Sequence, residues 1–385
     1  MNRTYLVALI IVSFSLSSIS NGQIPSIEPD FVLSGDVSNG RFGSSVGVSS
    51  QAIVVADNVA RRAFVYDPKT GEQRRILTAD VESLVNPPAD FNFGFDVDVW
   101  ENSALLGARR SSFPAEEEGA IHGGAAFLFD VDTGEQLHHF LPDPCNPCGS
   151  MGILGFFGNS VALNQDYAAI GEDRGRAFVF DVESGKEVFR FTPENELGFT
   201  DVALAGDLLA VAASDNVFVF DLSTQQQILS IPLEIDPQDT AVAISDGRVF
   251  VHTPSIISSF GLDGNLLATA ETESLISVNG DLAYSNGWLI TATELFDAND
   301  LSLVARFSEF GGAISIFENQ AVFGVPFQDN DQAFSFTVPE PEFSWLSALA
   351  IIFSLSRLRV RRFHFEVSSI TSATNQGNSR PSICW

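Results

Sequence analysis

The sequence predicts an all-β fold, a seven-bladed β-propeller with four antiparallel strands per blade, and three observations support this prediction. A unit of about 40 residues repeats along most of the chain. Each unit alternates short apolar segments with turns that contain Gly or Asp. The last unit stops one strand short, and an unassigned apolar segment precedes the first unit. Sheets of this size bury their faces only against neighbouring repeats, so a closed ring is the simplest solution.

The repeat is marked by an aromatic strand that ends in aspartate. Four copies are nearly identical: Phe64-Val65-Tyr66-Asp67, Phe127-Leu128-Phe129-Asp130, Phe178-Val179-Phe180-Asp181 and Phe218-Val219-Phe220-Asp221. Weaker copies end at residues 261, 297 and 337, so the successive intervals are 63, 51, 40, 40, 36 and 40 residues. Intervals of 40 define the unit, and the long ones place insertions at residues 81–89, 109–124 and 143–155.

The other strands of a unit follow from its turns. Residues 200–204 and 208–212 alternate apolar side chains on either side of Gly206-Asp207, which is the pattern of a hairpin. A second turn ending in Gly, as at Gly185, leads from the aromatic strand to a fourth strand at residues 187–191. Paired carboxylates can perform acid–base catalysis, but the repeated aspartates stand at turn entrances, where we expect them to accept backbone N–H bonds.

The two ends of the repeat region predict how the ring closes. The seventh unit ends after three strands at Val338, and residues 30–35 form an extra strand before the first unit. Lending that strand to the last blade would cover an open sheet edge. The propeller is therefore predicted to span residues 30–338. An open β-solenoid or a pair of β-sandwiches is the alternative, which the even spacing and the missing strand disfavour.

Composition limits the partners. Of 385 residues, 45% are hydrophobic and 18% are charged, which is typical of a globular chain. Lys and Arg total 20 against 49 Asp and Glu, a formal net charge of −29. This charge opposes the phosphate backbone of nucleic acids, so nucleic-acid binding is not expected.

Residues 1–23 have the layout of a secretory signal peptide. Arg3 precedes an apolar run at residues 5–16, and Ser18-Ile19-Ser20 provides small residues for cleavage. The alternatives are a buried N-terminal helix or a membrane anchor, but the run is shorter than the roughly 20 residues that span a bilayer. We expect a signal helix and export.

The C-terminal segment combines Pro339-Glu340-Pro341, an apolar run at residues 346–355 and a basic cluster at Arg357, Arg359, Arg361 and Arg362. This order resembles the PEP-CTERM sorting tail of exported bacterial proteins. The resemblance implies an apolar membrane helix within residues 339–362, a peptidase of the exosortase type as a partner, and Pro339, Glu340 and Pro341 as its motif. The polar residues 363–385 are expected to be disordered. An ordinary C-terminal anchor with a cytoplasmic tail is the alternative.

Three units begin with a Phe-Gly pair, at Phe42-Gly43, Phe93-Gly94 and Phe157-Gly158. These strands resemble the FG-GAP repeat of integrin-type propellers, in which many members bind calcium in an Asp- and Asn-rich loop between the first two strands. The corresponding turns here lack the six to eight oxygen ligands that calcium prefers, so calcium is at most a weak ligand. Residues 116–118 and 328–331 are acidic runs that we interpret as solvated loops.

No residue pattern indicates a catalytic, cofactor or metal site. Cys145 and Cys148 predict a small local disulfide in an exported protein, rather than a redox or zinc site. The five histidines show no metal-binding or Ser-His-acid spacing. We therefore expect a non-enzymatic binding or scaffold module at the cell surface or in the extracellular matrix, with an unknown protein or polysaccharide ligand bound near the insertions. The alternative is a propeller enzyme, such as a quinone-dependent dehydrogenase or a polysaccharide lyase, and it depends on fold analogy alone.

Overall fold

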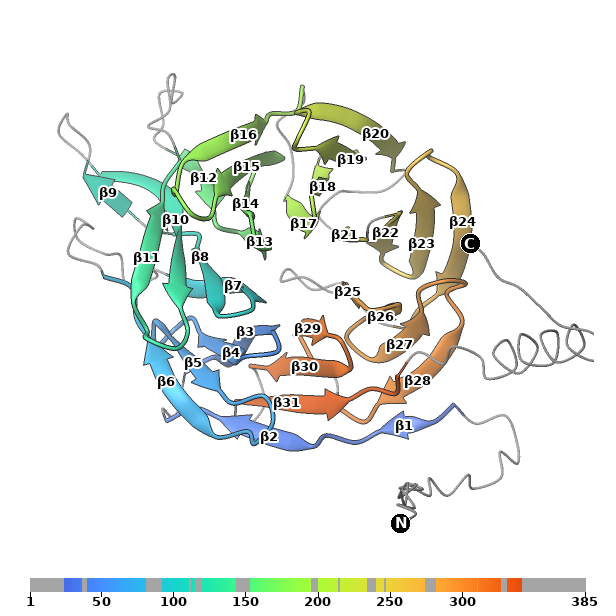
Figure 1. Cartoon of the computed structure of the whole chain (residues 1–385), viewed down its shortest axis with the longest axis horizontal. Helices are drawn as coiled ribbons and strands as arrows, with labels where there is room; N and C mark the ends of the chain where they lie inside the picture. Colours follow the sequence, from blue (N-terminus) through green and yellow to red (C-terminus); the bar gives the residue numbers. More distant parts are fainter. Residues whose placement is uncertain are drawn as a thin grey trace, which may run out of the picture. The chain divides into compact units, whose positions relative to one another are not determined.

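The chain forms a closed ring of seven β-sheets around a central channel (Figure 1). The computed structural model describes residues 24–36, 40–80, 92–110, 112–114, 120–142, 153–194, 200–213, 215–233, 240–245, 247–273, 282–309, 311–326 and 331–340. Within these ranges all regular elements are β-strands. The predicted seven-bladed, all-β architecture is confirmed. The expected terminal helices lie outside the described residues.

The blades follow one another along the chain, and the strands of each blade run in order from the channel outward. Blade 1 contains β3 (Phe42–Val48), β4 (Ile53–Asp57), β5 (Arg62–Tyr66) and β6 (Gln73–Leu77). Blade 2 contains β7 (Phe93–Trp100), β8 (Ser103–Ala108), β10 (Ala120–Asp130) and β11 (Gln136–Phe140). Blade 3 contains β13 (Ser160–Leu163), β14 (Tyr167–Glu172), β15 (Arg176–Asp181) and β16 (Glu187–Phe191).

The remaining blades repeat this arrangement. Blade 4 contains β17 (Asp201–Ala205), β18 (Leu208–Ala213), β19 (Asn216–Asp221) and β20 (Gln226–Pro232). Blade 5 contains β21 (Ala241–Ile244), β22 (Arg248–Thr253), β23 (Ile256–Gly261) and β24 (Leu266–Glu271). Blade 6 contains β25 (Ala283–Ser285), β26 (Trp288–Ile290), β27 (Glu294–Asp297) and β28 (Leu303–Phe307). Blade 7 contains β29 (Ala313–Phe317), β30 (Gln320–Val325), β31 (Gln332–Thr337) and the N-terminal strand β2 (Phe31–Ser34).

The ring closes in blade 7 as the sequence predicts. Strand β2 pairs antiparallel with β31, with Phe31 opposite Ser335 and Ser34 opposite Gln332. Leu33 is buried in the core that blades 7 and 1 share, and the Tyr66 hydroxyl donates to the Ser34 carbonyl at 2.8 Å. The first and last strands of the propeller therefore share one sheet.

Three further strands extend the blades beyond the four-strand prediction. Strand β1 (Ser26–Ile27) adds to the outer edge of blade 6, where it pairs parallel with β28. Strand β9 (Ser112–Pro114), in the insertion within blade 2, pairs antiparallel with the first half of β10. Strand β12 (Ile153–Phe157), in the connection between blades 2 and 3, pairs parallel with the same part of β10. The two segments thus form a small sheet at one end of β10.

Apolar packing between neighbouring blades holds the ring together. The cluster between blades 1 and 2, for example, joins Val54 and Val65 to Phe93 and Phe127, all fully buried. The rings of Phe93 and Phe127 meet edge to face with their centroids 5.8 Å apart. The repeated phenylalanines are therefore core residues, because blade faces have no other surface against which to bury.

The glycine of each Phe-Gly pair packs against the neighbouring blade. Gly43, Gly94 and Gly158 have φ values of +87°, +73° and +85°, which side chains rarely tolerate. A Cβ atom on Gly43 would lie 2.6 Å from the Gln332 carbonyl oxygen of blade 7. The Phe-Gly pair is thus explained by contact between blades.

The repeated aspartates close the turns between the third and fourth strands, as expected. Asp67 Oδ1 accepts the N–H groups of Lys69 at 2.9 Å and Thr70 at 3.0 Å. Asp130, Asp181 and Asp221 accept equivalent N–H bonds. The pKa of each aspartate is lowered, because these hydrogen bonds stabilise the charged form of the carboxylate.

We expect Gln225→Gly to stabilise the protein by about 0.5–1 kcal/mol. Gln225 has a φ of +57° at the position, four residues after the turn aspartate, that Gly71, Gly134 and Gly185 occupy in other blades. Glycine removes the strain of this conformation, and urea unfolding measures the gain. The neighbouring Gln226→Gly, inside strand β20, should instead lose stability. A loss with both variants would contradict the strain argument.

Candidate functional site

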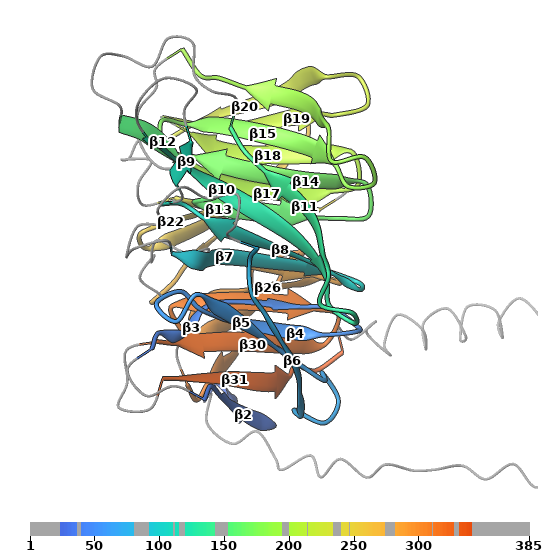
Figure 2. The same cartoon turned by 90° about the vertical axis from the view of Figure 1, so that its left-hand side faces the viewer.

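The two faces of the ring differ in what they carry. One face carries the turns between first and second strands and those between third and fourth strands. The opposite face carries the connections between blades and those between second and third strands, at the left edge of Figure 2. The ends of all three predicted insertions lie on this second face, which we call the loop-bearing face. No helix of the described residues is long and apolar enough to cross a membrane.

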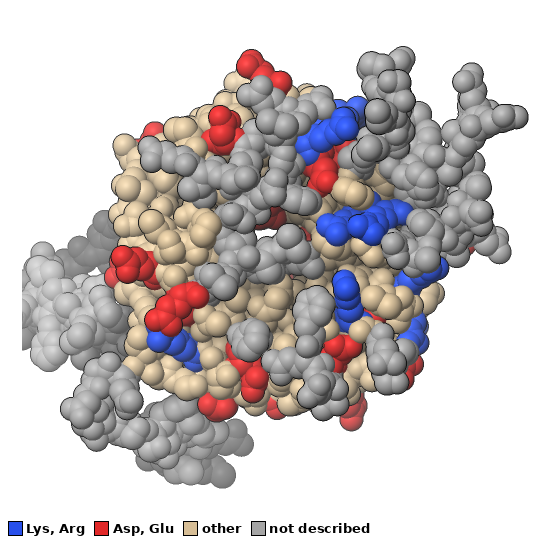
Figure 3. Space-filling view, turned by 180° about the vertical axis from the view of Figure 1, so that it is seen from behind, with Lys and Arg blue, Asp and Glu red and all other residues tan. Residues whose placement is uncertain are grey.

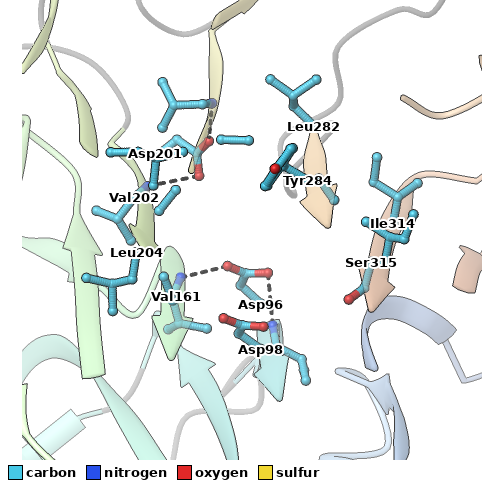
Figure 4. Close-up of a pocket in the computed structure, with 18 of the residues that line it drawn as sticks. Asp96, Asp98, Val161, Asp201, Val202, Leu204, Leu282, Tyr284, Ile314 and Ser315 are labelled. Carbon is cyan, nitrogen blue, oxygen red and sulfur yellow. Dashed lines mark hydrogen bonds between the residues drawn. The ribbon is translucent and has the colours of Figure 1, made fainter. Parts of the chain in front are cut away.

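The central channel forms a pocket of about 170 Å³ that all seven innermost strands line. Most of its lining is aliphatic, from residues such as Val46, Val242 and Ile314. Asp96, Asp98 and Asp201 form its charged part, and Tyr284 and Ser315 stand on the facing side (Figure 4). The described lining includes no arginine or histidine.

The channel carboxylates join neighbouring blades through backbone hydrogen bonds. Asp96 of blade 2 accepts the N–H of Val161 in blade 3 at 2.7 Å. Asp98 likewise accepts the N–H of Leu163 at 2.7 Å. Asp201 of blade 4 accepts the N–H of Val242 in blade 5 at 2.8 Å. These N–H groups point out of open sheet edges, so the carboxylates satisfy donors that the fold leaves unpaired.

Hydroxyl groups complete this arrangement. Ser45 donates to Asp96 at 3.2 Å, and Ser160 donates to Asp201 at 2.9 Å. The second oxygen of each carboxylate accepts from the next residue of its own strand, as Asp98 does from Val99 at 2.8 Å. Each carboxylate oxygen thus accepts at least one hydrogen bond from a donor that belongs to the fold.

The carboxylates titrate higher than usual. Burial raises the pKa of Asp98 to about 7, against the N–H bonds from Leu163 and Val99, and the charge of Asp96 raises it further. Burial also raises the pKa of Asp201 to about 6 and that of Asp96. All three side chains keep part of their surface open to the channel. Burial therefore disfavours the charged form of each group compared with an exposed aspartate.

We expect the thermal midpoint to rise as the pH falls from about 8 to about 5. The folded pKa of Asp98 lies above its unfolded value of 3.8, so the folded state binds more protons between these two values. This contribution is present at the lower pH and is lost as the pH rises through the folded pKa. The Asp98→Asn variant should reduce the difference between the two midpoints. Asp67→Asn is the control. The pKa of the Asp67 carboxyl is lowered, so this group stays charged between pH 5 and pH 8.

A second arrangement of charged groups lies on the loop-bearing face, between blades 2 and 3. The Arg109 guanidinium lies 3.7 Å from the centroid of Phe95 and 5.5 Å from that of Phe156. Its Nη1 donates to Asn159 Oδ1 at 3.3 Å. Burial lowers the pKa of Arg109 to about 10, and the charge of Arg110 lowers it further. We call Phe95, Arg109, Arg110, Phe156 and Asn159 the Arg109 cluster.

Acidic groups of blade 3 lie next to this cluster. Burial raises the pKa of Asp173 to about 6, against the charges of Arg109 and Arg174. Glu172 is buried, forms an ion pair with Arg176 and has a pKa raised to about 7 by burial. Figure 3 shows Lys and Arg side chains gathered on this side of the loop-bearing face.

Several residues singled out from the sequence lie outside the described part of the chain: Cys145, Cys148, Pro341, Arg357, Arg359, Arg361 and Arg362. Pro339 and Glu340 are exposed at the end of the propeller, where the Pro339 carbonyl accepts the indole N–H of Trp288 at 2.7 Å. His252 is fully buried in blade 5. Within the described ranges, no three His, Cys, Asp or Glu side chains gather to hold a metal ion.

Sequence reasoning missed the channel bridges, although the repeats carry a signal for them. Ser45, Asp96, Ser160 and Asp201 occupy the same repeat position, directly before a valine, and alternate hydroxyl with carboxylate. A hydroxyl donor and a carboxylate acceptor at equivalent positions of adjacent repeats indicate that these side chains contact each other between neighbouring blades. No comparable signal marks the Arg109 cluster, because its members come from two blades separated by insertions.

Comparisons with known proteins support the fold. No known family matches the sequence, and no curated protein matches it. The chain in "Structure of U3-55K" is 12% identical with a TM-score of 0.58, covering 80% of this chain and 98% of that one. A chain in "Crystal Structure of Mitotic Checkpoint Complex" is 12% identical with a TM-score of 0.59, covering 84% and 99%. At this identity the likeness concerns the seven-bladed propeller and not its function.

Proposed function

We propose that the protein is an exported, non-enzymatic interaction module that binds a protein or polysaccharide partner on its loop-bearing face. The observation that carries this proposal is the contrast between the channel and that face. The channel carboxylates are occupied by backbone donors of the next blade. On the loop-bearing face, the Arg109 cluster instead holds a partly buried cation between aromatic rings. Loops on a rigid scaffold are where binding residues concentrate.

The terminal sequences support export to the cell surface or extracellular matrix. Cleavage near residue 23 would leave β1 intact, since its first hydrogen bond runs from Arg306 N–H to the Pro25 carbonyl at 2.9 Å. At the other end, the PEP-CTERM-like motif begins where the propeller's last hydrogen bond is made, at Pro339. An exosortase-type peptidase would act there, with the membrane as a transient anchor. The Phe-Gly glycines support a relationship to FG-GAP propellers.

The enzyme alternative has one observation in its favour. The pKa of about 7 at Asp98 lies in the range that suits a general acid or base. Both of its oxygens already accept backbone N–H groups, however. These bonds favour the charged carboxylate and fix its orientation against blade 3, and the described channel lining offers no arginine or histidine as a catalytic partner, so we favour binding over a propeller dehydrogenase or lyase.

The proposal is tested by retention on protein and glycan arrays, with and without EDTA. We expect saturable retention of one partner class by the full-length protein. Arg174 is exposed on the loop-bearing face, so Arg174→Glu should weaken the retention. Lys69 is exposed in a turn on the opposite face, so Lys69→Glu should not change it. Equal loss with both variants would contradict the assignment of the face. Conversion of a retained compound into product would overturn the non-enzymatic assignment.

A further inference from the structure

Arg109 differs from the ion-paired arginines of the propeller. In the described part of the chain, five arginines form ion pairs with carboxylates: Arg62, Arg74, Arg176, Arg190 and Arg306. Among the described residues, no carboxylate oxygen lies within ion-pair distance of Arg109. Acidic residues outnumber basic ones by 49 to 20 in this chain, so an arginine without such a partner is unexpected. Asp173 attracts the Arg109 charge but lies beyond ion-pair distance, so part of the free energy lost on burying this cation is not recovered by a direct ion pair among the described residues.

The guanidinium is held in a fixed orientation. One flat side stacks on Phe95, and Nη1 is bound to Asn159. Nε is buried and has no acceptor in the described part of the chain. Nε and Nη2 form the edge of the guanidinium that donates two parallel hydrogen bonds to a carboxylate. The side chain is therefore oriented in advance for an oxyanion with two oxygens.

The surroundings limit the kind of oxyanion. The net charge of −29 repels any polymer that carries a negative charge on every unit. Phe156 is only partly buried and offers an apolar surface beside both Arg109 and Arg110. The short strand β9, which begins three residues after Arg109, is an edge strand among the described residues. Such an edge can pair with an extended backbone.

We propose that the Arg109 cluster binds an extended peptide segment of a partner protein, with one carboxylate side chain on the Arg109 guanidinium between uncharged neighbours. The carboxylate accepts from Nε and Nη2, and an apolar neighbour packs on Phe156. This proposal rests on the proposed interaction function, and it specifies which chemical group of the partner the protein would recognise. An acidic polysaccharide would meet the same guanidinium but would place further charges against an acidic surface.

Two labelled peptide pools test the proposal by fluorescence anisotropy on the full-length protein. Each pool holds a central residue between randomised uncharged residues; the central residue is Glu in one pool and Gln in the other. We expect the Glu pool to bind about tenfold more tightly, the effect of one charge-assisted hydrogen-bonded pair. Arg109→Met should abolish the preference. Arg190→Met, which removes the same charge and a similar ring contact from the outer edge of blade 3, should keep it.

Thermal unfolding without peptide separates binding from structure. The Arg109→Met variant loses the Asn159 hydrogen bond and the attraction of Asp173 but also the cost of burying the cation, so we expect its midpoint to lie within about 2 °C of that of the original protein. A midpoint lower by several degrees, without a Glu preference in the original protein, would show that Arg109 is structural and overturn the proposal. Arg109-dependent binding of oligogalacturonate without a Glu preference would overturn the peptide as occupant. A partner that binds the Arg109→Met variant equally well would remove this site but leave the interaction module standing.

Discussion

Replacing Gly158 by Ala should lower the free energy of unfolding by about 3 kcal/mol, one of the largest effects of a single methyl group in this protein. Gly158 follows Phe157 at the start of blade 3, with a φ of +85°. A Cβ atom there would lie 2.3 Å from the Ala125 carbonyl oxygen and 2.9 Å from the Ala108 nitrogen. Both are backbone atoms of blade 2, so neither can move without separating the two blades. Urea unfolding measures the loss.

Gly206 provides the matched control for this substitution. It also has a positive φ, of +55°, but no atom lies within 4 Å of the position that a Cβ atom would take. Gly206→Ala should therefore cost only the backbone strain, about 1 kcal/mol. The difference between the two variants isolates the contact between blades. Equal losses would mean that the Phe-Gly pair is needed for backbone conformation alone.

The features that could be predicted from the sequence are those set by local pattern and period. The aromatic strand recurs in each unit, and an aspartate ends it in five of the seven, so the turns, the blade count and the missing last strand follow from spacing. The two-residue strand β1 has no pattern that distinguishes it from a linker. Strand β9 lies in one insertion and β12 begins in another, and the period does not apply to either segment. Both strands pair with the N-terminal part of β10, which extends beyond the length of the repeated strand.

The candidate site was harder to predict because its contacts join distant residues. In the sequence, Asp96 and Asp98 look like ordinary alternating polar residues of a strand. The N–H groups that donate hydrogen bonds to them belong to residues 65 positions later. Arg109 meets Phe156 only because β12 adds to β10 beyond the blade. Side-chain contacts between blades therefore required the three-dimensional structure, although the repeated Ser and Asp positions carried part of the information.

Opening the ring should have the other large effect. Leu33→Ala is expected to destabilise the protein by about 3 kcal/mol, because Leu33 is 2% exposed in the core between blades 7 and 1. Its neighbour Val32 is 55% exposed on the same strand, so Val32→Ala should change stability by less than about 0.5 kcal/mol. Both variants keep the backbone pairing of β2 with β31. Their difference therefore measures the apolar part of ring closure.

Truncation tests the backbone part of the same closure. A protein that begins at residue 29 loses β1 but keeps β2, and should unfold in one transition close to that of the full chain. A protein that begins at residue 36 also loses β2 and leaves the outer edge of β31 unpaired. We expect its thermal midpoint to fall further than that of Leu33→Ala, and the amides of β31 to lose protection in hydrogen exchange first. Equal midpoints for the two truncations would mean that packing between blades, rather than the shared sheet, keeps the ring closed.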